Sequence, residues 1–205
     1  MTVYVESNFV LELAFVRAEQ AECDSLLKMA KAQQIVLTLP AFSLGEPYEA
    51  LARRAKQRRD LHDKLQTELK ELSRSQPYQR TSQELQQSSG FLLQSIGEET
   101  RRLGNTLDSM LEVAQIIPID AQTIRTAISL QQSHELAPQD AIVFASILAH
   151  LSSAAPPASC FITKNSRDFV VIPVLADLAK YNCKLLTRFS DGLGYINSQR
   201  PSSFV

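Results

Sequence analysis

The chain has 205 residues, of which 44% are hydrophobic and 21% are charged. These values are close to the globular average and exclude extensive disorder, a collagen-like repeat and a small fold held by disulfides. A single domain accommodates the whole length, 1–205. The formal net charge of −1 gives no overall attraction to nucleic acid or to an anionic membrane, so any such attraction has to be local.

Positive charge is concentrated in one short segment. Its five bases, with no acid, lie within seven residues: Arg53, Arg54, Lys56, Arg58 and Arg59. The rest of the chain then has 16 bases against 22 acids, a net charge of −6. Most charge clusters of this kind are solvated helix faces. A surface for a polyanionic substrate is the alternative, because residue 53 lies seven residues after Glu46, two turns along the same helix face.

The cysteines and the apolar segments bear on the cellular compartment of the protein. Cys23, Cys160 and Cys183 are an odd number at wide spacing, which is typical of buried thiols in a reducing compartment. Residues 1–6 contain no base before the first carboxylate, so they do not form a secretion signal. The longest apolar stretch, 141–151, is too short to span a bilayer. We therefore expect a cytoplasmic protein without membrane contact.

Short β-prone runs alternate with helical patterns along the chain. The run at 2–5 precedes apolar residues at helical spacing over 9–16, and a second helix is expected at 20–33. The unalternating run at 35–39 is typical of a strand buried on both faces. The further expected elements are helices at 46–72 and 82–112 around a loop at 73–80, a strand at 116–119, helices at 121–133 and 138–151, a strand at 159–163, a helix at 174–180 and a strand at 184–187.

This alternation predicts an α/β fold. Right-handed β-α-β crossovers give an α/β/α sandwich around a parallel sheet of about five strands. The Gln-, Glu-, Arg- and Leu-rich helices at roughly 53–112 form a long insertion into the domain, and the polar tail from residue 190 is expected to be loose.

Polar side chains collect where the strands of this sheet end. Glu6 ends the first strand, Glu46 opens the helix after the second, Asp140 opens the helix before the fourth, and Asn165 and Asp168 follow the fourth. Open parallel sheets bind ligands at this edge. Carboxylates brought together there repel each other, and a bound divalent cation relieves the repulsion. The sequence therefore predicts a site for a hard metal ion.

Other phosphate-handling and catalytic motifs are absent from the sequence. Neither GxGxxG nor GxxxxGK[ST] occurs among only six glycines, which excludes the common nucleotide-binding loops. The three histidines are far apart, with no HExxH and no cysteine pair, so a zinc site is not expected. The GxSxG motif of serine hydrolases does not occur either.

Four segments resemble the motifs of PIN-domain nucleases, in the order of that family. Residues 3–8, VYVESN, resemble the opening strand, which usually ends in Asp-x-Asn. Residues 42–46, FSLGE, are similar to the second motif, an acid that opens the helix after strand two. Residues 136–145, LAPQDAIVFA, and 161–169, FITKNSRDF, are similar to the third and fourth motifs and are the more specific matches.

The resemblance implies a fold, an activity and a set of site residues. It implies metal-dependent hydrolysis of phosphodiester bonds, most often in RNA, and many family members are toxins of VapC-type pairs with a small antitoxin protein. The implied cofactor is Mg²⁺ or Mn²⁺. The catalytic acids would be Glu6, Glu46, Asp140 and Asp168, the metal ligands these four with Asn165, and the substrate contacts would include Asn8 and Thr163. The charge pattern adds Arg53 and Lys56 as substrate contacts, because they best share the helix face of Glu46.

Two departures from the family pattern bear on catalysis. Position 6 is Glu where Asp is usual, and position 165 is a neutral Asn where other members place an acid. These changes either tune the metal site or mark a member with weakened catalysis. The alternative functions are thus a PIN-fold module that binds RNA or a protein partner without efficient cleavage, and a helical interaction protein on an α/β scaffold. A homodimer is a possible assembly.

The second motif also has a purely structural interpretation. Ser43 and Glu46 have the spacing of a capping box, with the serine as N-cap. Pro47 argues against this register, because it would remove the first intrahelical hydrogen bond, whereas a helix that begins near Glu46 tolerates proline in its first turn. We therefore favour a site role for Glu46.

The other acids have structural alternatives of different weight. Asp140 would also suit the positive end of a helix dipole. Asp168 would also pair with Lys164 or Arg167, a contact worth little if it is exposed. Glu6 at the mouth of a central strand has few such uses, because Glu is rarely buried without a partner, and it is the strongest candidate on physical grounds.

Overall fold

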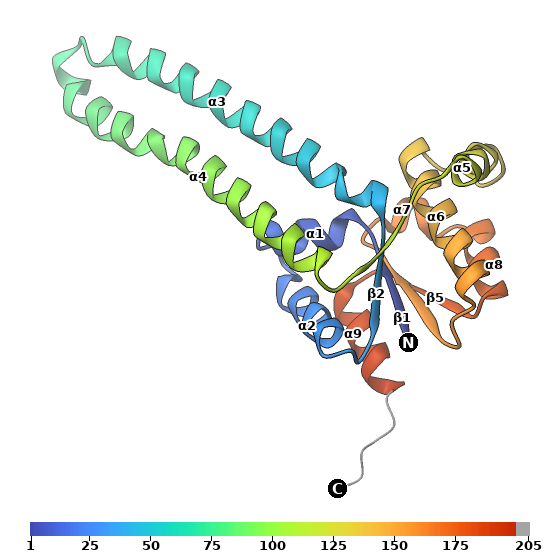
Figure 1. The fold of residues 1–205 in the computed structure, drawn as a ribbon. Helices are drawn as coiled ribbons and strands as arrows, with labels where there is room; N and C mark the ends of the chain where they lie inside the picture. Colours follow the sequence, from blue (N-terminus) through green and yellow to red (C-terminus); the bar gives the residue numbers. More distant parts are fainter. Residues whose placement is uncertain (200–205) are drawn as a thin grey trace, which may run out of the picture.

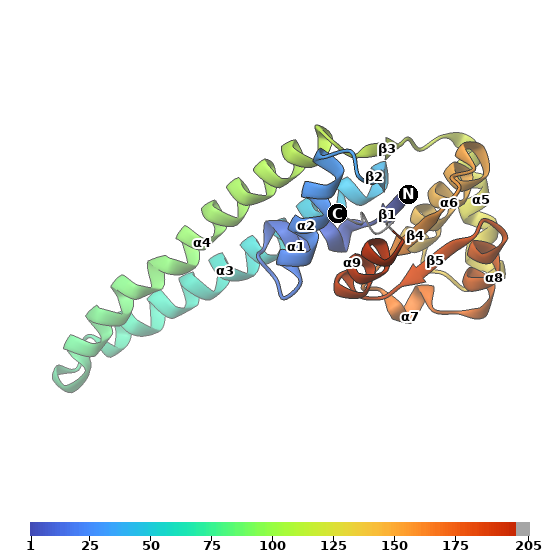
Figure 2. The same cartoon turned by 90° about the horizontal axis from the view of Figure 1, so that it is seen from below.

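The computed structural model describes residues 1–199, in which five parallel strands form one sheet between helices (Figures 1 and 2). The strand order is β3-β2-β1-β4-β5, so β1 lies at the centre with β2 and β4 on either side. In this register Tyr4 lies beside Thr38 on one side and Phe161 on the other. The strands are β1 (Thr2–Val5), β2 (Val36–Pro40), β3 (Gln115–Ile117), β4 (Ser159–Ile162) and β5 (Cys183–Leu186). The predicted α/β/α sandwich is confirmed.

Helices cover both faces of the sheet, and each face has its own core. Val3 and Val5 point into one core while Tyr4 points into the other, and none of the three is exposed. This is why β1 is an unbroken apolar run. The first core packs against α1 (Ser7–Ala14), α2 (Gln20–Lys31) and α9 (Phe189–Ser198), and the second against α5 (Ala121–Ser133), α6 (Pro138–Ala154), the short α7 (Ser166–Phe169) and α8 (Ile172–Lys180).

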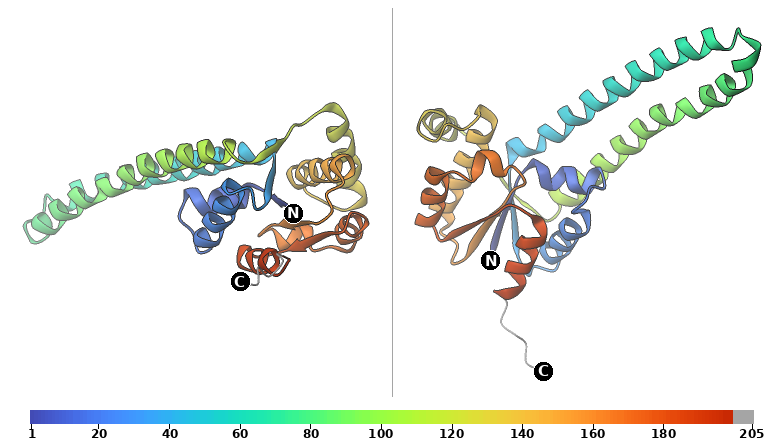
Figure 3. Two further views of the ribbon diagram at one scale, coloured as in Figure 1. Left: turned by 60° about the horizontal axis from the view of Figure 1, so that its bottom comes forward. Right: turned by 180° about the vertical axis from the view of Figure 1, so that it is seen from behind.

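Two long helices project from the sheet domain as an antiparallel hairpin (Figure 3). They are α3 (Glu46–Leu72) and α4 (Gln79–Leu111), joined through a 3₁₀ turn at Gln76–Tyr78. The hairpin lies between β2 and β3 in the chain and corresponds to the insertion expected at roughly 53–112. Its base packs on α1, and its distal half extends away from the sheet domain.

The prediction of a loose tail from residue 190 is wrong up to residue 199, because Phe189–Ser198 forms α9. Phe189 and Ile196, seven residues apart, are buried, and the Phe189 ring meets the Phe9 ring edge-on at a centroid distance of 5.5 Å. Two glycines and several polar residues hide this apolar spacing in the sequence. The part of the tail from 200 to 205 lies outside the described residues.

Gly192 sets how closely α9 approaches the sheet, which leads to a stability prediction. A Cβ at this position would lie 2.3 Å from Ile162 Cδ1 in β4. We expect Gly192→Ala to lower the free energy of unfolding by about 1–3 kcal/mol through overpacking. The control is Gly194→Ala in the same helix, where nothing lies within 4 Å. That change should stabilise the protein by about 0.5–1 kcal/mol. Urea denaturation checks both, and equal effects would contradict this account of the packing.

The structure bears on two expectations from the sequence, one about the cysteines and one about membrane-spanning segments. All three cysteines fall among the described residues, and all are unpaired and buried, as predicted. Within residues 1–199, none of the helices combines the length and the apolar character needed to cross a membrane.

Candidate active site

The predicted acids gather at the carboxyl edge of the central strands. Glu6 directly follows β1, and Glu46 is the first residue of α3. Asp140 lies in the first turn of α6, and Asn165 precedes α7. The Asn165 side-chain amide donates a hydrogen bond to Asp140 Oδ1 at 3.0 Å. Residues far apart in the sequence thus meet at the edge where an open parallel sheet binds its ligands.

Glu6 is buried and accepts four hydrogen bonds. Its Oε2 accepts from Ser7 Oγ and from the Asn8 backbone N–H, both at 2.8 Å. Its Oε1 accepts from Asn8 Nδ2 at 2.7 Å and from Thr163 Oγ1 at 3.0 Å. A carboxylate has about four lone-pair positions, so this arrangement uses all of them. Glu6 therefore caps α1 and ties the loop after β4 to the start of that helix.

The positions of Asn8 and Thr163 differ from the substrate contacts that the sequence predicts. Both side chains donate to Glu6, and Thr163 is fully buried. The Thr163 hydroxyl also accepts from the Asn165 backbone N–H at 2.9 Å. Both polar groups therefore hold Glu6 and the loop of Asn165 in place, and their contact with a substrate stays a prediction from the sequence.

The carboxyl groups of the site influence one another. Burial raises the pKa of Asp140 to about 6, and the negative charges of Asp168, Glu46 and Glu6 contribute to that rise. Burial also raises the pKa of Glu46, with a further contribution from Glu6, while the Ser7 hydroxyl hydrogen bond opposes it. Four acids therefore share one electrostatic environment, in which each negative charge makes the next one costlier.

The start of α3 decides between the two interpretations of Glu46. The helix begins at Glu46 with Pro47 in its first turn, as predicted, and no side chain caps it. Ser43 is the buried residue of a 3₁₀ turn at Ala41–Leu44, and its hydroxyl has no hydrogen-bond partner in the part of the chain that the structure describes. The capping box is therefore not formed, and Glu46 is free to face Ser7 and the other acids.

Asp168 does not form the ion pair considered as its alternative. Lys164 pairs instead with Glu12 at 2.9 Å and with Glu19 at 3.6 Å. No ion pair of Asp168 occurs within the described range 1–199. Its half-buried carboxylate instead lines a hollow beside the site and adds to the charge felt by Asp140.

Two hollows flank the acidic residues, and each contains one arginine. The first has a volume of about 200 Å³ and is lined by Glu46, Glu49, Ser7, Gln139 and Arg53 among others. The second, of about 340 Å³, is lined by Asp168, Arg167, His134 and neighbouring residues. The acids are thus approached from two sides through hollows that place a cation next to a carboxylate.

The basic segment 53–59 divides into two groups. Arg58 pairs with Glu99 of α4 at 2.8 Å. Arg54 lies 3.6 Å from the same carboxylate and stacks over the Phe15 ring at 4.6 Å. These two arginines hold the hairpin to itself and to α1. Arg53, Lys56 and Arg59 are exposed, and of these Arg53 lines the hollow of Glu46.

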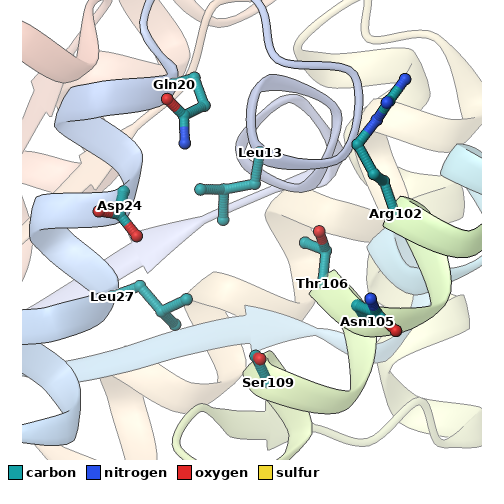
Figure 4. Close-up of a pocket in the computed structure, with 8 residues that line it drawn as sticks. All are labelled: Leu13, Gln20, Asp24, Leu27, Arg102, Asn105, Thr106 and Ser109. Carbon is teal, nitrogen blue, oxygen red and sulfur yellow. The ribbon is translucent and has the colours of Figure 1, made fainter. Parts of the chain in front are cut away.

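A third hollow lies apart from the acids, at the base of the hairpin (Figure 4). It has a volume of about 260 Å³ and lies between α1, α2 and α4. Its lining is mixed, with Leu13 and Leu27 beside Asp24 and Arg102. None of the predicted site residues contributes to it.

Residues 3–169 match the family model described as PIN domain. The chain belongs to the PIN-domain family. It is also similar in structure to a chain from the VapBC2 complex of Rickettsia felis bound to a DNA fragment from its promoter, with 15% identity, a TM-score of 0.45, and coverage of 90% of this chain and 97% of that one. No curated protein sequence matches with comparable significance. PIN domains are generally nucleases that use divalent metals.

The donor set of this PIN domain suits a hard divalent cation. Carboxylate and amide oxygens are the ligands that Mg²⁺ and Mn²⁺ prefer. Residues 1–199 contain no preformed group of three or more His, Cys, Asp or Glu side chains placed to hold a metal ion. Glu46, Asp140 and Asp168 keep lone pairs for a cation, with Asn165 as a neutral donor beside them, whereas the lone pairs of Glu6 are occupied. Glu6 as a direct metal ligand stays a prediction from the sequence, and the hydrogen bonds of its carboxylate support a positioning role as well.

Sequence reasoning about this PIN domain missed Ser7, Arg167 and Gln139. Ser7 donates to Glu6 and, with Glu46, lines the first hollow. Arg167 and Gln139 line the two hollows that flank the acids. Each is adjacent in sequence to a predicted acid, and this adjacency is the signal that would have found them.

Proposed function

We propose that this PIN domain is a divalent-metal-dependent endoribonuclease that hydrolyses RNA phosphodiester bonds. The observation that carries the proposal is the gathering of Glu46, Asp140 and Asp168 around the carboxyl edge of β1 and β4, where burial and mutual repulsion raise the pKa of Asp140. Such a cluster is costly to fold, and the cost is expected at a site that works on a cation-bound substrate. The RNA substrate follows from the family resemblance.

Each polar group of the site then has a defined task. Mg²⁺ or Mn²⁺, held by Glu46, Asp140, Asp168 and Asn165, would lower the pKa of a bound water and polarise the phosphodiester. Asn165 holds the Asp140 side chain in place through its amide. Glu6, saturated by its four donors, keeps the loop after β4 in register with α1.

The flanking arginines support a polyanionic substrate. Arg53 on the Glu46 side and Arg167 on the Asp168 side would each contact a phosphate of a strand that crosses the acids. Lys56 follows Arg53 by three residues and lies on the neighbouring part of the same exposed helix surface. Local cations of this kind are needed because the chain outside the basic segment carries a net charge of −6.

Cleavage of a single-stranded RNA in the presence of Mn²⁺ tests this proposal. The parent protein should cut the RNA with Mn²⁺ and lose the activity when EDTA removes the metal. The Asp140→Asn protein, purified in parallel, controls for contaminating ribonuclease. Equal cleavage by the two proteins would refute the assignment.

A salt series tests the substrate contacts separately from cleavage. We expect the double change Arg53→Ala with Lys56→Ala to flatten the slope of log K against log[salt] for single-stranded RNA by about 1.4, since each lost phosphate contact removes about 0.7. Binding is measured in the Asp140→Asn background so that the RNA stays intact. Arg80→Ala, at the exposed tip of the hairpin, is the control and should leave the slope unchanged. The same slope in all three proteins would indicate that the basic segment is only a solvated helix face.

A second function is favoured by the saturation of Glu6. Because this glutamate has no lone pair left for a cation, the chain would act as a PIN-fold module that binds RNA or a protein partner with weak cleavage. RNA binding by the parent protein without Mn²⁺-dependent cleavage would indicate this function. The toxin role and a small antitoxin partner stay predictions from the family resemblance, and a small reading frame beside the gene would support both.

A further inference from the structure

The distal half of the α3–α4 hairpin has a mostly polar seam along which the two helices meet. The seam residues are Arg58, His62 and Leu69 of α3 and Ser82, Ser89 and Glu99 of α4. Arg58 pairs with Glu99, His62 Nδ1 lies 3.2 Å from the Ser89 carbonyl oxygen, and Gln66 donates to Ser89 Oγ at 2.7 Å. Among the described residues of the hairpin beyond residue 55, the buried apolar side chains up to residue 96 are Leu69 and Ile96. Two helices joined by so little apolar contact gain little stability from each other.

Leucines of α3 lie beside this seam on one side. Leu61 and Leu65 follow Arg58 and His62 by three residues, and Leu72 follows the seam residue Leu69 by three. At 3.6 residues per turn, a step of three residues falls short of a full turn, so the three leucines form a stripe rotated from the seam in one sense. Leu61 is 54% exposed and Leu72 is 45% exposed.

In α4, too, leucines lie three residues after seam residues. Leu85 and Leu92 come three residues after the buried seam residues Ser82 and Ser89. The rotation from the seam has the same sense as in α3, and two antiparallel helices then present both stripes on one face of the hairpin. We call Leu61, Leu65, Leu72, Leu85 and Leu92 the leucine face.

The opposite face of the hairpin is different in character. The residues four positions after His62, Leu69, Ser82 and Ser89 lie on that side, and they are Gln66, Ser73, Gln86 and Leu93. Three of these four are polar. Gln66 reaches from this side into the seam, where it donates to Ser89 and to the Gln86 carbonyl oxygen. The leucines are therefore concentrated on one side of the hairpin, although Leu93 and Phe91 are also exposed away from it. Such a concentration is typical of a helix pair with a partner on that side.

At the base of the hairpin the protein's own helices cover the continuation of the leucine face. Arg54, three residues after Leu51, stacks on Phe15 next to α1. Thr106, three residues after Leu103, lines the hollow that Leu13 of α1 and α2 close (Figure 4). The same face is thus covered near the sheet domain, whereas beyond it Leu61, Leu72 and Leu85 are exposed and Leu65 and Leu92 are half-buried.

We propose that the leucine face of a second copy of this chain covers this distal part, with the two hairpins antiparallel about a twofold axis. The stripe in α3 has its midpoint between residues 66 and 67, and the stripe in α4 has its midpoint between residues 88 and 89. The hydrogen bond from Gln66 to Ser89 shows that these midpoints lie at the same height on the hairpin. A twofold axis at that height pairs both stripes with their copies at once.

Charged residues beside the leucine face favour a twofold axis at the same height. Lys64 and Glu68 are exposed, lie one turn apart, and are centred on residue 66. In the antiparallel pair Lys64 of each copy therefore faces Glu68 of the other. A parallel arrangement would instead place like charges together, so the side chains next to the leucine face favour the antiparallel one.

The arrangement also fits the length of the hairpin. Helix α3 continues about 8 Å beyond the midpoint at 1.5 Å per residue, so α3 of the second copy reaches about residue 61. Coverage by the chain's own α1 begins near Arg54, which leaves room for both sheet domains. An overlap only about 16 Å long buries less area than a standard interface of about 800 Å² per partner, so a weak dimer with a Kd on the order of 10 µM is expected.

Sedimentation of the full chain between about 1 and 200 µM tests this dimer. The parent should pass from monomer to dimer across that range, and Leu85→Glu should raise the Kd at least about tenfold. Leu93→Glu is the matched control, since it makes the same change in the same helix at a residue that is 42% exposed, against 48% for Leu85, on the opposite face. Circular dichroism verifies that each variant stays folded. A parent that remains monomeric at the highest concentration, or an equal effect of both variants, would overturn the proposal.

Charge exchange tests the register and the identity of the partner. Lys64→Glu alone and Glu68→Lys alone each place like charges opposite each other in both halves of the dimer and should weaken it. An equimolar mixture of the two variants restores two opposite-charge pairs and should dimerise. A mixture that stays as weakly associated as its components would refute the antiparallel pairing, whatever else binds the leucine face.

Discussion

Asp140→Asn should stabilise the metal-free protein near neutral pH while it removes most of the RNA cleavage. Both effects come from one carboxylate held among Asp168, Glu46 and Glu6. The asparagine keeps an oxygen that accepts the Asn165 amide, so the fold is retained. It removes the negative charge whose repulsion the folded protein has to tolerate and on which a cation depends.

The stability effect depends on pH in a definite direction. The folded protein keeps the Asp140 proton up to about pH 6, whereas the unfolded chain loses it near the ordinary value of 3.8. The free energy of unfolding therefore falls as the pH rises between these values. Allowing for solvent at this half-exposed group, Asp140→Asn should recover about 1–2 kcal/mol at pH 7, a rise of about 3–6 °C in Tm. Below pH 4 the difference should vanish.

Mn²⁺ should reverse the order of stability of the parent and the Asp140→Asn protein. Mn²⁺ at a hundredfold excess over its Kd should stabilise the parent by about 2.7 kcal/mol. Asp140→Asn should lose most of that gain, and cleavage should fall by about 10²–10³. Asp63→Asn, exposed on α3, is the control and should change neither quantity. Thermal melts at two pH values with and without Mn²⁺ measure all of this. A parent whose Tm does not respond to Mn²⁺ would argue against a metal site.

Much of the fold could be predicted because its signals are local. The buried run at Val3–Val5 and the boundaries of the helices at 46–72 and 121–133 come from apolar spacing and from Pro47, which acts within one turn. The five strands follow from the same pattern. Helix α9 was not predicted, because its two buried residues, Phe189 and Ile196, are separated by glycines and polar residues whose spacing alone favours a loop.

The sequence predicts which residues meet at the candidate site better than it predicts the role of each residue. Acids at strand ends must come together in a parallel sheet, so proximity follows from topology. The commitment of Glu6 to Thr163 depends on a residue 157 positions away. The division of the basic segment likewise depends on Glu99, which lies 41 positions after Arg58. Partners chosen across such separations are fixed by packing, which no local pattern encodes.

Lys164→Met should lower the free energy of unfolding by about 2–3 kcal/mol, because the Glu12 carboxylate it pairs with is almost fully buried. The Lys164 side chain is 33% exposed and that of Glu12 is 2% exposed, so the lysine neutralises a charge that water hardly reaches. The expected fall in Tm is about 5–10 °C. Lys180→Met is the control, because its pair with Asp177 is shorter, at 2.6 Å, yet the lysine is 68% exposed. An exposed pair should contribute less than about 1 kcal/mol.

Two further results would separate charge neutralisation from packing at Lys164. If the lost stability reflects the unpaired charge of Glu12, adding Glu12→Gln to Lys164→Met should restore at least about half of it, because removing the second charge abolishes the penalty. The glutamine oxygen can still accept the Glu19 N–H, which now donates to Glu12 at 2.8 Å. A double variant as unstable as the sum of its single changes would show that Lys164 acts through packing. Because Lys164 lies between Thr163 and Asn165, the pair also fixes the loop that holds Glu6 and Asp140, so Lys164→Met should weaken Mn²⁺ binding and the double variant should recover it.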